Sequence, residues 1–289
     1  MFNLFQQIED ALHNLLIQFI KANLTTMFTD VNTQTGSIAA EVGKTPQGWN
    51  GSIYTMIHSL SDSVIIPIAG LVITFVLCYE LITMITEKNN MAEMDTWMFY
   101  KWFFKAFVAV YLVTHTWDIV MAVFDVGQHL VNQAAALITG QTEIDITSTI
   151  AQFDASMQTM ELGEILQLAV ETMLVCMSMK IIAILITVVL YGRMIEIYLY
   201  TSVAPVPFAT MMNREWGQVG SNYVRGLIAL GFQGFFIILC VGIYSVLVKS
   251  MTVSSDIHSA LLGIAAYTVV LCFALFRTGS LSKSIFGAH

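Results

Sequence analysis

Three ionisable residues, Glu80, Asp118 and Lys180, lie within long apolar segments, where a charged group is costly unless it is paired or hydrated. A helical rise of about 1.5 Å per residue places Lys180 roughly 16 Å from the inner end of its segment, and Asp118 and Glu80 roughly 22 Å and 9 Å from that boundary. The lysine stem could reach either carboxylate. The pattern predicts an intramembrane polar network, which either lines an aqueous path or forms a buried ion pair that fixes helix register.

Other motifs that carry chemistry are absent from the sequence. There is no Gly-rich phosphate loop, no H-E-x-x-H, no G-x-S-x-G and no CxxC. The histidines and the four cysteines share no spacing that is typical of a metal site or a redox pair. We therefore expect no catalytic residue, no metal, no cofactor and no enzymatic activity.

The elements that must position the charged residues are apolar segments of about the length that crosses a membrane. Their bounds are Ser63–Ile85, Phe103–Val123, Ile165–Tyr191, Ile195–Met212, Gly226–Val248 and Ala260–Phe276. A spanning helix needs about 20 residues, and a backbone in lipid must satisfy its own hydrogen bonds. Hydrophobic residues make up 56% of the chain and charged residues 11%. The sequence predicts an all-α, multi-pass membrane helix bundle.

The fourth apolar segment decides the predicted topology. It contains Pro205 and Pro207, each of which removes a helix hydrogen bond. If 195–212 does not cross fully, the rule that positive residues stay inside is obeyed by most of the remaining cations, namely Arg193, Arg214, Arg225, Arg277 and Lys283. We expect about five crossings plus a Pro-broken or re-entrant segment, with the N-terminus outside and the C-terminus inside.

The predicted domains follow from this topology. Residues 1–62 form an extracytoplasmic region, 63–277 the membrane domain and 278–289 a short cytoplasmic tail. Within the membrane domain, 127–164 is expected to be a central outside loop because it contains acidic residues but no Lys or Arg.

The extracytoplasmic region is expected to begin with an amphipathic helix over Met1–Ala22. Its apolar residues recur at helical spacing, with polar residues on the other face. Such a helix would lie on the membrane surface, against a partner, or against the protein's own bundle. The Gly- and Thr-rich stretch Thr25–Gly51 is expected to be a loop.

The fifth apolar segment is rich in small residues, which let membrane helices approach closely. Gly231 and Gly234 flank Gln233, whose amide can form an interhelical hydrogen bond. These three residues are the candidate helix-contact positions, between subunits or within ordinary membrane packing.

The chain carries a formal net charge of −8 with 12 scattered Lys and Arg residues, and it shows no basic stripe along which DNA could be held. This pattern argues against direct DNA binding but does not exclude DNA that passes nearby.

The segment from Thr201 to Arg225 resembles the signature of the TrbL-like polytopic inner-membrane subunit of conjugative type IV secretion systems, in its Gram-positive branch. The residues that carry the resemblance are Ala204, Pro205, Phe208, Arg214 and Trp216. The outside N-terminus, five crossings and inside C-terminus are similar as well. The central loop and the C-terminal tail are shorter than in the family, which leaves partner contacts there open.

The resemblance implies a channel subunit in the bacterial cytoplasmic membrane, at the base of a conduit that spans the cell envelope. It implies a homo-oligomeric ring, with a pentamer as one arrangement, other secretion subunits including ATPases as partners, and a relaxase–DNA complex as cargo. The alternative is a secondary transporter, with a midplane site at the Pro-broken helix and with Lys180 and Asp118 as coupling groups.

Overall fold

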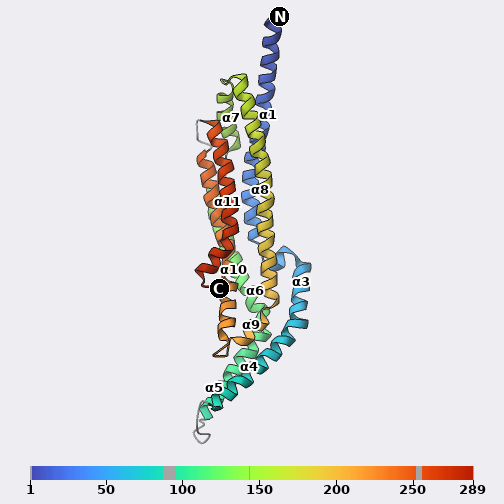
Figure 1. Cartoon of the computed structure of the whole chain (residues 1–289), viewed down its shortest axis with the longest axis vertical. Helices are drawn as coiled ribbons and strands as arrows, with labels where there is room; N and C mark the ends of the chain where they lie inside the picture. The colour runs from blue at the N-terminus through green and yellow to red at the C-terminus, as the bar shows by residue number, and fades with distance from the viewer. Residues whose placement is uncertain (1, 87–95, 143, 252–255, 289) are drawn as a thin grey trace. The chain divides into compact units, whose positions relative to one another are not determined.

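The computed structural model describes residues 2–86, 96–142, 144–251 and 256–288, which are almost entirely helical and contain no strand (Figure 1). The helices are α1 (Phe2–Val42), α2 (Pro46–Trp49), α3 (Gly51–Leu60), the π-helical turn η1 (Ser61–Ile65), α4 (Ile66–Thr86), α5 (Thr96–Thr114), α6 (Thr116–Thr142), α7 (Ile146–Met157), α8 (Leu162–Ser202), α9 (Pro205–Thr210), α10 (Gly217–Met251) and α11 (Ile257–Ile285).

Four continuous helical runs in the described ranges are long and apolar enough to cross a membrane: Gly51–Thr86, Leu162–Ser202, Gly217–Met251 and Ile257–Ile285. The pair α5 and α6 makes a fifth if it counts as one span. The prediction of an all-α, multi-pass membrane bundle is confirmed.

The prediction of a continuous span over Phe103–Val123 was wrong, because the chain bends by 65° between α5 and α6. The Thr114 hydroxyl donates to the carbonyl of Val110 at 3.0 Å, and the Thr116 hydroxyl donates to that of Leu112 at 2.7 Å. Hydroxyls that bond back to the preceding turn compete with the helix backbone and favour a bend.

The prediction of a loop over Thr25–Gly51 was also wrong for most of its length, because α1 continues to Val42. Met27, Phe28, Val31 and Ile38 continue the helical spacing and are buried. Burial of that face outweighs the modest helix propensity of Gly and Thr. The expected N-terminal helix is thus the first part of α1, and its own bundle covers α1 from Ile17 onward.

The expected outside loop over 127–164 is largely helical as well, since α6 extends to Thr142 and α7 occupies Ile146–Met157. A low content of basic residues reports the side of the membrane on which a segment lies, not whether it is helical. Asn32 of α1 holds the start of α7: its Nδ2 donates to the Ile144 carbonyl at 3.0 Å, and its Oδ1 accepts the Ile144 N–H at 3.2 Å.

The chain forms two compact units, and the predicted division into an extracytoplasmic region, a membrane domain and a cytoplasmic tail stays a prediction. The first comprises Met1–Val42, Val131–Leu190 and Phe235–Thr278. The second comprises Gly43–Leu130, Tyr191–Gly234 and Gly279–His289.

The core of the first unit is apolar and combines parts of α1, α6, α7, α8, α10 and α11. Phe28 of α1 stacks on Phe153 of α7 with ring centroids 6.5 Å apart. An ion pair between Lys21 and Asp154 at 2.6 Å borders this core, and so does a hydrogen bond between His258 Nδ1 and Glu171 Oε2 at 2.5 Å.

The core of the second unit combines α4, α5, α6, the end of α8, α9 and the first half of α10. Its most buried residues include Ala69, Ala109, Val120, Ala209 and Leu227. Small residues at several of these positions let the helices pack closely.

Asp145 precedes α7 and accepts the N–H groups of Thr147 and Ser148 at 3.1 Å and 3.3 Å. These hydrogen bonds, above all that from the Ser148 backbone, hold the pKa of the Asp145 carboxyl below its usual value. A lowered pKa in the folded state stabilises α7 fully above the unfolded value of about 4, and this contribution is lost as the pH falls through the folded value.

We therefore expect hydrogen-exchange protection of the first turn of α7 to fall when the pH drops below about 4. Asp145→Asn supplies the control, because asparagine also caps helices but does not titrate. Equal loss of protection in both proteins would contradict this assignment.

Candidate functional site at the break between α8 and α10

Two prolines shape the connection between the long helices α8 and α10. Helix α8 ends at Ser202, and Pro205 begins α9 at the position where a missing backbone N–H costs least. Residues 195–202 thus belong to α8, and the rest of the predicted segment contains one short helix. The prediction of a Pro-broken element is confirmed.

Phe208 fixes α9 within the second unit, where α9 packs on α4 and α5. Its side chain is 3% exposed and meets the Tyr223 ring edge-on, with centroids 5.9 Å apart. The Tyr223 hydroxyl donates to the Tyr200 carbonyl at 2.8 Å, and the two tyrosine rings stack at 4.6 Å. This cluster joins the end of α8 to α9 and α10.

Asn213 organises the turn that leads into α10. Its Oδ1 accepts the N–H groups of Glu215 and Trp216 at 2.8 Å and 3.0 Å, which satisfies donors that precede the helix. Its Nδ2 donates to Glu80 Oε2 of α4 at 3.4 Å. One buried amide therefore holds both the turn and a neighbouring helix.

Trp216 places the start of α10 against α4. Its ring stacks on Phe75 and Tyr79 with centroid distances of 5.4 Å and 5.3 Å. The Tyr79 hydroxyl donates to Glu215 Oε2 at 3.0 Å.

Two glycines permit this close packing. A Cβ at Gly220 would lie 2.6 Å from the carbonyl oxygen of Pro207, and one at Gly217 would lie 2.9 Å from that of Met211. The sequence interpretation missed both glycines and Asn213, although a Gly-x-x-Gly spacing after a Pro-containing segment was a usable signal.

The sequence profile described as TrbL/VirB6 plasmid conjugal transfer like protein matches residues 31–205, more than half of the chain. The chain belongs to the TrbL/VirB6-like conjugal transfer family. It is therefore a multi-pass membrane component of a conjugative type IV secretion system, a machine in which it works with other transfer subunits. No curated protein and no solved structure matches the chain significantly.

The motif positions of this TrbL/VirB6-like protein divide into two groups. Ala204, Pro205 and Phe208 are buried in the second unit, whereas Arg214 is exposed and Trp216 is half-buried. The profile match ends at 205, so the last three of these residues lie beyond it. The structure gives the first group a packing role.

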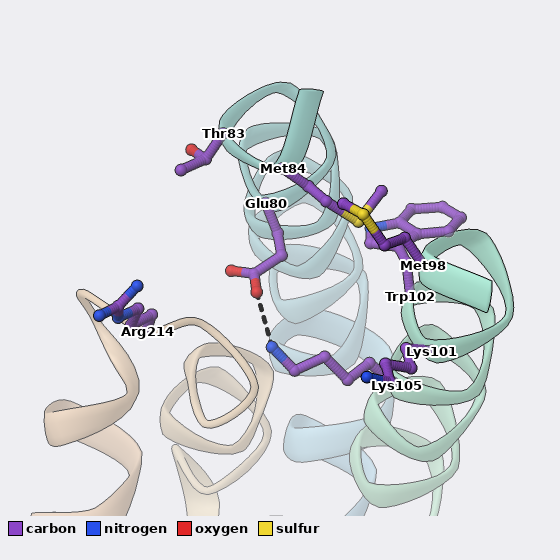
Figure 2. A pocket seen from close by; sticks show the side chains of 8 residues that line it. All are labelled: Glu80, Thr83, Met84, Met98, Lys101, Trp102, Lys105 and Arg214. Carbon is purple, nitrogen blue, oxygen red and sulfur yellow. Dashed lines mark hydrogen bonds and ion pairs between the residues drawn. The ribbon is translucent and has the colours of Figure 1, made fainter. Parts of the chain in front are cut away.

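Of the candidate polar network, Glu80 has an ion-pair partner that was not among the predicted members. Glu80 binds Lys105 of α5, with Oε1 2.6 Å from Nζ (Figure 2). Lys180 belongs to the first unit and Asp118 to the second, and the side chains of both are exposed. A pairing of Lys180 with either carboxylate stays a prediction. Lys105 was not among the predicted site residues.

The candidate helix-contact positions lie in the interior of α10. The carbonyl oxygen of Gly231 would be 2.7 Å from a Cβ added at Gly127 of α6, so these two backbones approach closely. Gln233 is buried with its Nε2 near Gly279 of α11, and Gly234 is buried. Gly231 and Gln233 thus serve packing within the chain, and a contact between subunits stays a prediction.

Arg193 was not among the predicted site residues, yet it is 7% exposed, and its Nε has no hydrogen-bond partner in the described ranges. Its neighbour Glu196 instead binds Lys283 at 2.8 Å. A buried guanidinium is costly, which makes Arg193 a functional candidate that composition alone does not reveal.

The Glu80–Lys105 pair should be worth more than the Glu196–Lys283 pair. Glu80 is 22% and Lys105 44% exposed, whereas both members of the second pair are 41% exposed. Double-mutant cycles built from Glu80→Gln and Lys105→Met, and from Glu196→Gln and Lys283→Met, should give coupling energies of about 1 kcal/mol and below about 0.5 kcal/mol. Equal couplings would show that the shielding of Glu80 has no energetic effect.

Proposed function

We propose that this protein is a structural and channel subunit at the membrane base of a conjugative type IV secretion machine, where it assists the transfer of relaxase-bound DNA. The family match carries this proposal. Several copies would form a ring in the bacterial cytoplasmic membrane and contact the secretion ATPases, and the protein would act without catalysis of its own.

Exposed apolar side chains support assembly in a membrane. In the first unit, α8 exposes Leu166, Met173, Met177 and Ile184, each by more than half. In the second unit, α4 exposes Leu71 by 74%. Such faces require lipid or another subunit as a covering, and methionine suits adaptable contacts.

Lys180 supports a ring more specifically. It is an exposed cation on the same helix as Met177 and Ile184, in a run that is otherwise strongly apolar. Facing lipid would be costly, whereas facing a water-filled path or a neighbouring copy would not be. We assign Lys180 to a subunit contact or a channel wall, with exposed carboxylates such as Asp118 as partners.

The proposed topology has the N-terminus outside and the C-terminus inside, with α5 and α6 together forming one crossing. In a cysteine-free background, a unique cysteine at Ser221 should be protected from an impermeant reagent added outside, and one at Thr159 should react. Labelling of the Ser221 position from outside would refute this topology.

Assembly separates the proposal from the transporter alternative. Mass photometry in nanodiscs should find an oligomer of several copies, and Lys180→Ala should reduce its yield, whereas Lys180→Arg should preserve it. A donor that lacks the protein should lose DNA transfer and regain it with the wild-type chain. A stable monomer that takes up a small solute by itself would overturn the proposal.

A further inference from the structure

A cavity of about 310 Å³ opens between α4, α5 and the turn before α10, in the second unit (Figure 2). Its charged lining comprises, in the described part of the chain, three cationic residues and one acidic residue: Lys101, Lys105, Arg214 and Glu80. Figure 2 shows the Arg214 side chain across the opening from Lys105, with Glu80 between them. Among the described lining residues, the formal positive charges exceed the negative ones by two.

Glu80 is already engaged and does not neutralise the whole cluster. Its Oε1 binds Lys105 and its Oε2 accepts the Asn213 amide. The next carboxylate along the chain, Glu215, accepts the Tyr79 hydroxyl. Lys101 lies 5.8 Å from the centre of the Trp97 ring. An anion that enters the cavity would meet the positive charges of Lys101, Lys105 and Arg214.

An apolar hollow of about 820 Å³ adjoins the cationic cavity and shares Lys101 and Lys105 with it. The rest of its lining is aromatic: Trp97, Tyr100, Phe103, Phe104 and Phe107. All five side chains are 60–71% exposed. Trp97, Tyr100, Phe104 and Phe107 recur every three or four residues and so share one face of α5.

The order of side chains along α5 matches the depth profile of one membrane leaflet. Trp and Tyr stand at the end that carries the lysines, and phenylalanines follow. Trp and Tyr favour the headgroup level. From Trp97 to Phe107 the helix rises about 15 Å, which is half of a hydrocarbon layer about 30 Å thick.

We infer that this cavity and hollow form one binding site for an anionic phospholipid. The lipid phosphate is held by Lys101 and Arg214, with Lys105 beside them, and the acyl chains lie along the aromatic face of α5. A soluble phosphate would use the cations but gain nothing from the hollow. A zwitterionic lipid would use the hollow but neutralise the cations less.

Native mass spectrometry of the detergent-purified full-length chain tests this assignment. Phosphatidylglycerol should bind more tightly than phosphatidylcholine. Lys101→Gln and Arg214→Gln should each weaken phosphatidylglycerol binding about fivefold, and the double variant about 25-fold, as expected for basic residues near an anionic lipid surface. Phe104→Ala should weaken both lipids.

Arg225→Gln is the matched control, because Arg225 is an exposed arginine outside the cavity lining. Its affinity for phosphatidylglycerol should equal that of the wild type. If Arg214→Gln does not fold, Lys101→Gln decides the question, since Lys101 is exposed and pairs only with Trp97 among the interactions described.

Three results would overturn the inference. If Arg225→Gln weakened phosphatidylglycerol binding as much as the cavity variants do, the binding would be a general attraction of basic residues to anionic lipid. If millimolar inorganic phosphate displaced the lipid, the cationic residues would form a site for a soluble anion instead of a lipid headgroup. Loss of oligomers in lipid-free detergent on Phe104→Ala, with unchanged lipid binding, would assign the hollow to a second copy.

Discussion

Phe208→Ala is expected to lower the free energy of unfolding by about 3–5 kcal/mol, the usual cost of removing a buried phenylalanine from a core. Phe208 is 3% exposed and contacts Tyr223, whose hydroxyl joins α10 to the end of α8. The cavity would loosen three elements at once, because α9 holds both helices together. Titration with sodium dodecyl sulfate, followed by circular dichroism, would measure the loss.

Phe273→Ala is the matched control for this substitution. Phe273 lies on α11 and is 67% exposed, so its removal should change the unfolding free energy by less than about 0.5 kcal/mol. If Phe208→Ala were equally mild, α9 would not be the element that fastens the break between α8 and α10.

Gly127→Ala is expected to destabilise the second unit by about 1–3 kcal/mol, although alanine usually favours a helix. The added Cβ would lie 2.7 Å from the Gly231 carbonyl oxygen and 3.1 Å from its carbonyl carbon. Both atoms belong to the backbone and cannot rotate away, so α6 and α10 would have to separate. The same detergent titration would detect this.

The alanine substitution of the other glycine at this crossing, Gly231, should be tolerated. A Cβ at Gly231 would meet Val123 at 3.4 Å, an ordinary contact with the end of a side chain. Gly231→Ala should therefore be neutral or stabilising by up to about 1 kcal/mol. Strong destabilisation by Gly231→Ala together with a mild effect of Gly127→Ala would show that the crossing is not the one described.

Hydropathy predicted most of the spans, because the length of an apolar run is what a bilayer selects. Hydropathy did not predict the sharp bend after Thr114, because the Thr and His residues there do not lower the hydropathy enough to end the apolar run. The continuation of α1 past Ala22 was not predicted for a different reason. Composition suggested a turn, while the burial that stabilises 25–42 depends on distant parts of the chain.

The candidate site shows the same division. The Pro-broken element was predictable because proline acts on its own backbone. The partner of Glu80 was not, since depth along a helix gives no information about rotation around its axis. Lys105 binds Glu80 because α5 turns that face toward α4, and only tertiary packing sets this turn.

The length of α8 has a consequence for how the protein meets the bilayer. Its exposed apolar residues run from Leu166 to Leu199, a distance of about 50 Å along the axis. Even a tilt of 40°, the upper end of the common range, leaves a projection of about 38 Å against roughly 30 Å of hydrocarbon. Hydrophobic mismatch of this size either deforms the surrounding bilayer or leaves apolar side chains exposed to water. A neighbouring subunit that covers one end of α8 would remove both costs. The stability of the assembled machine would then depend on the thickness of the bilayer.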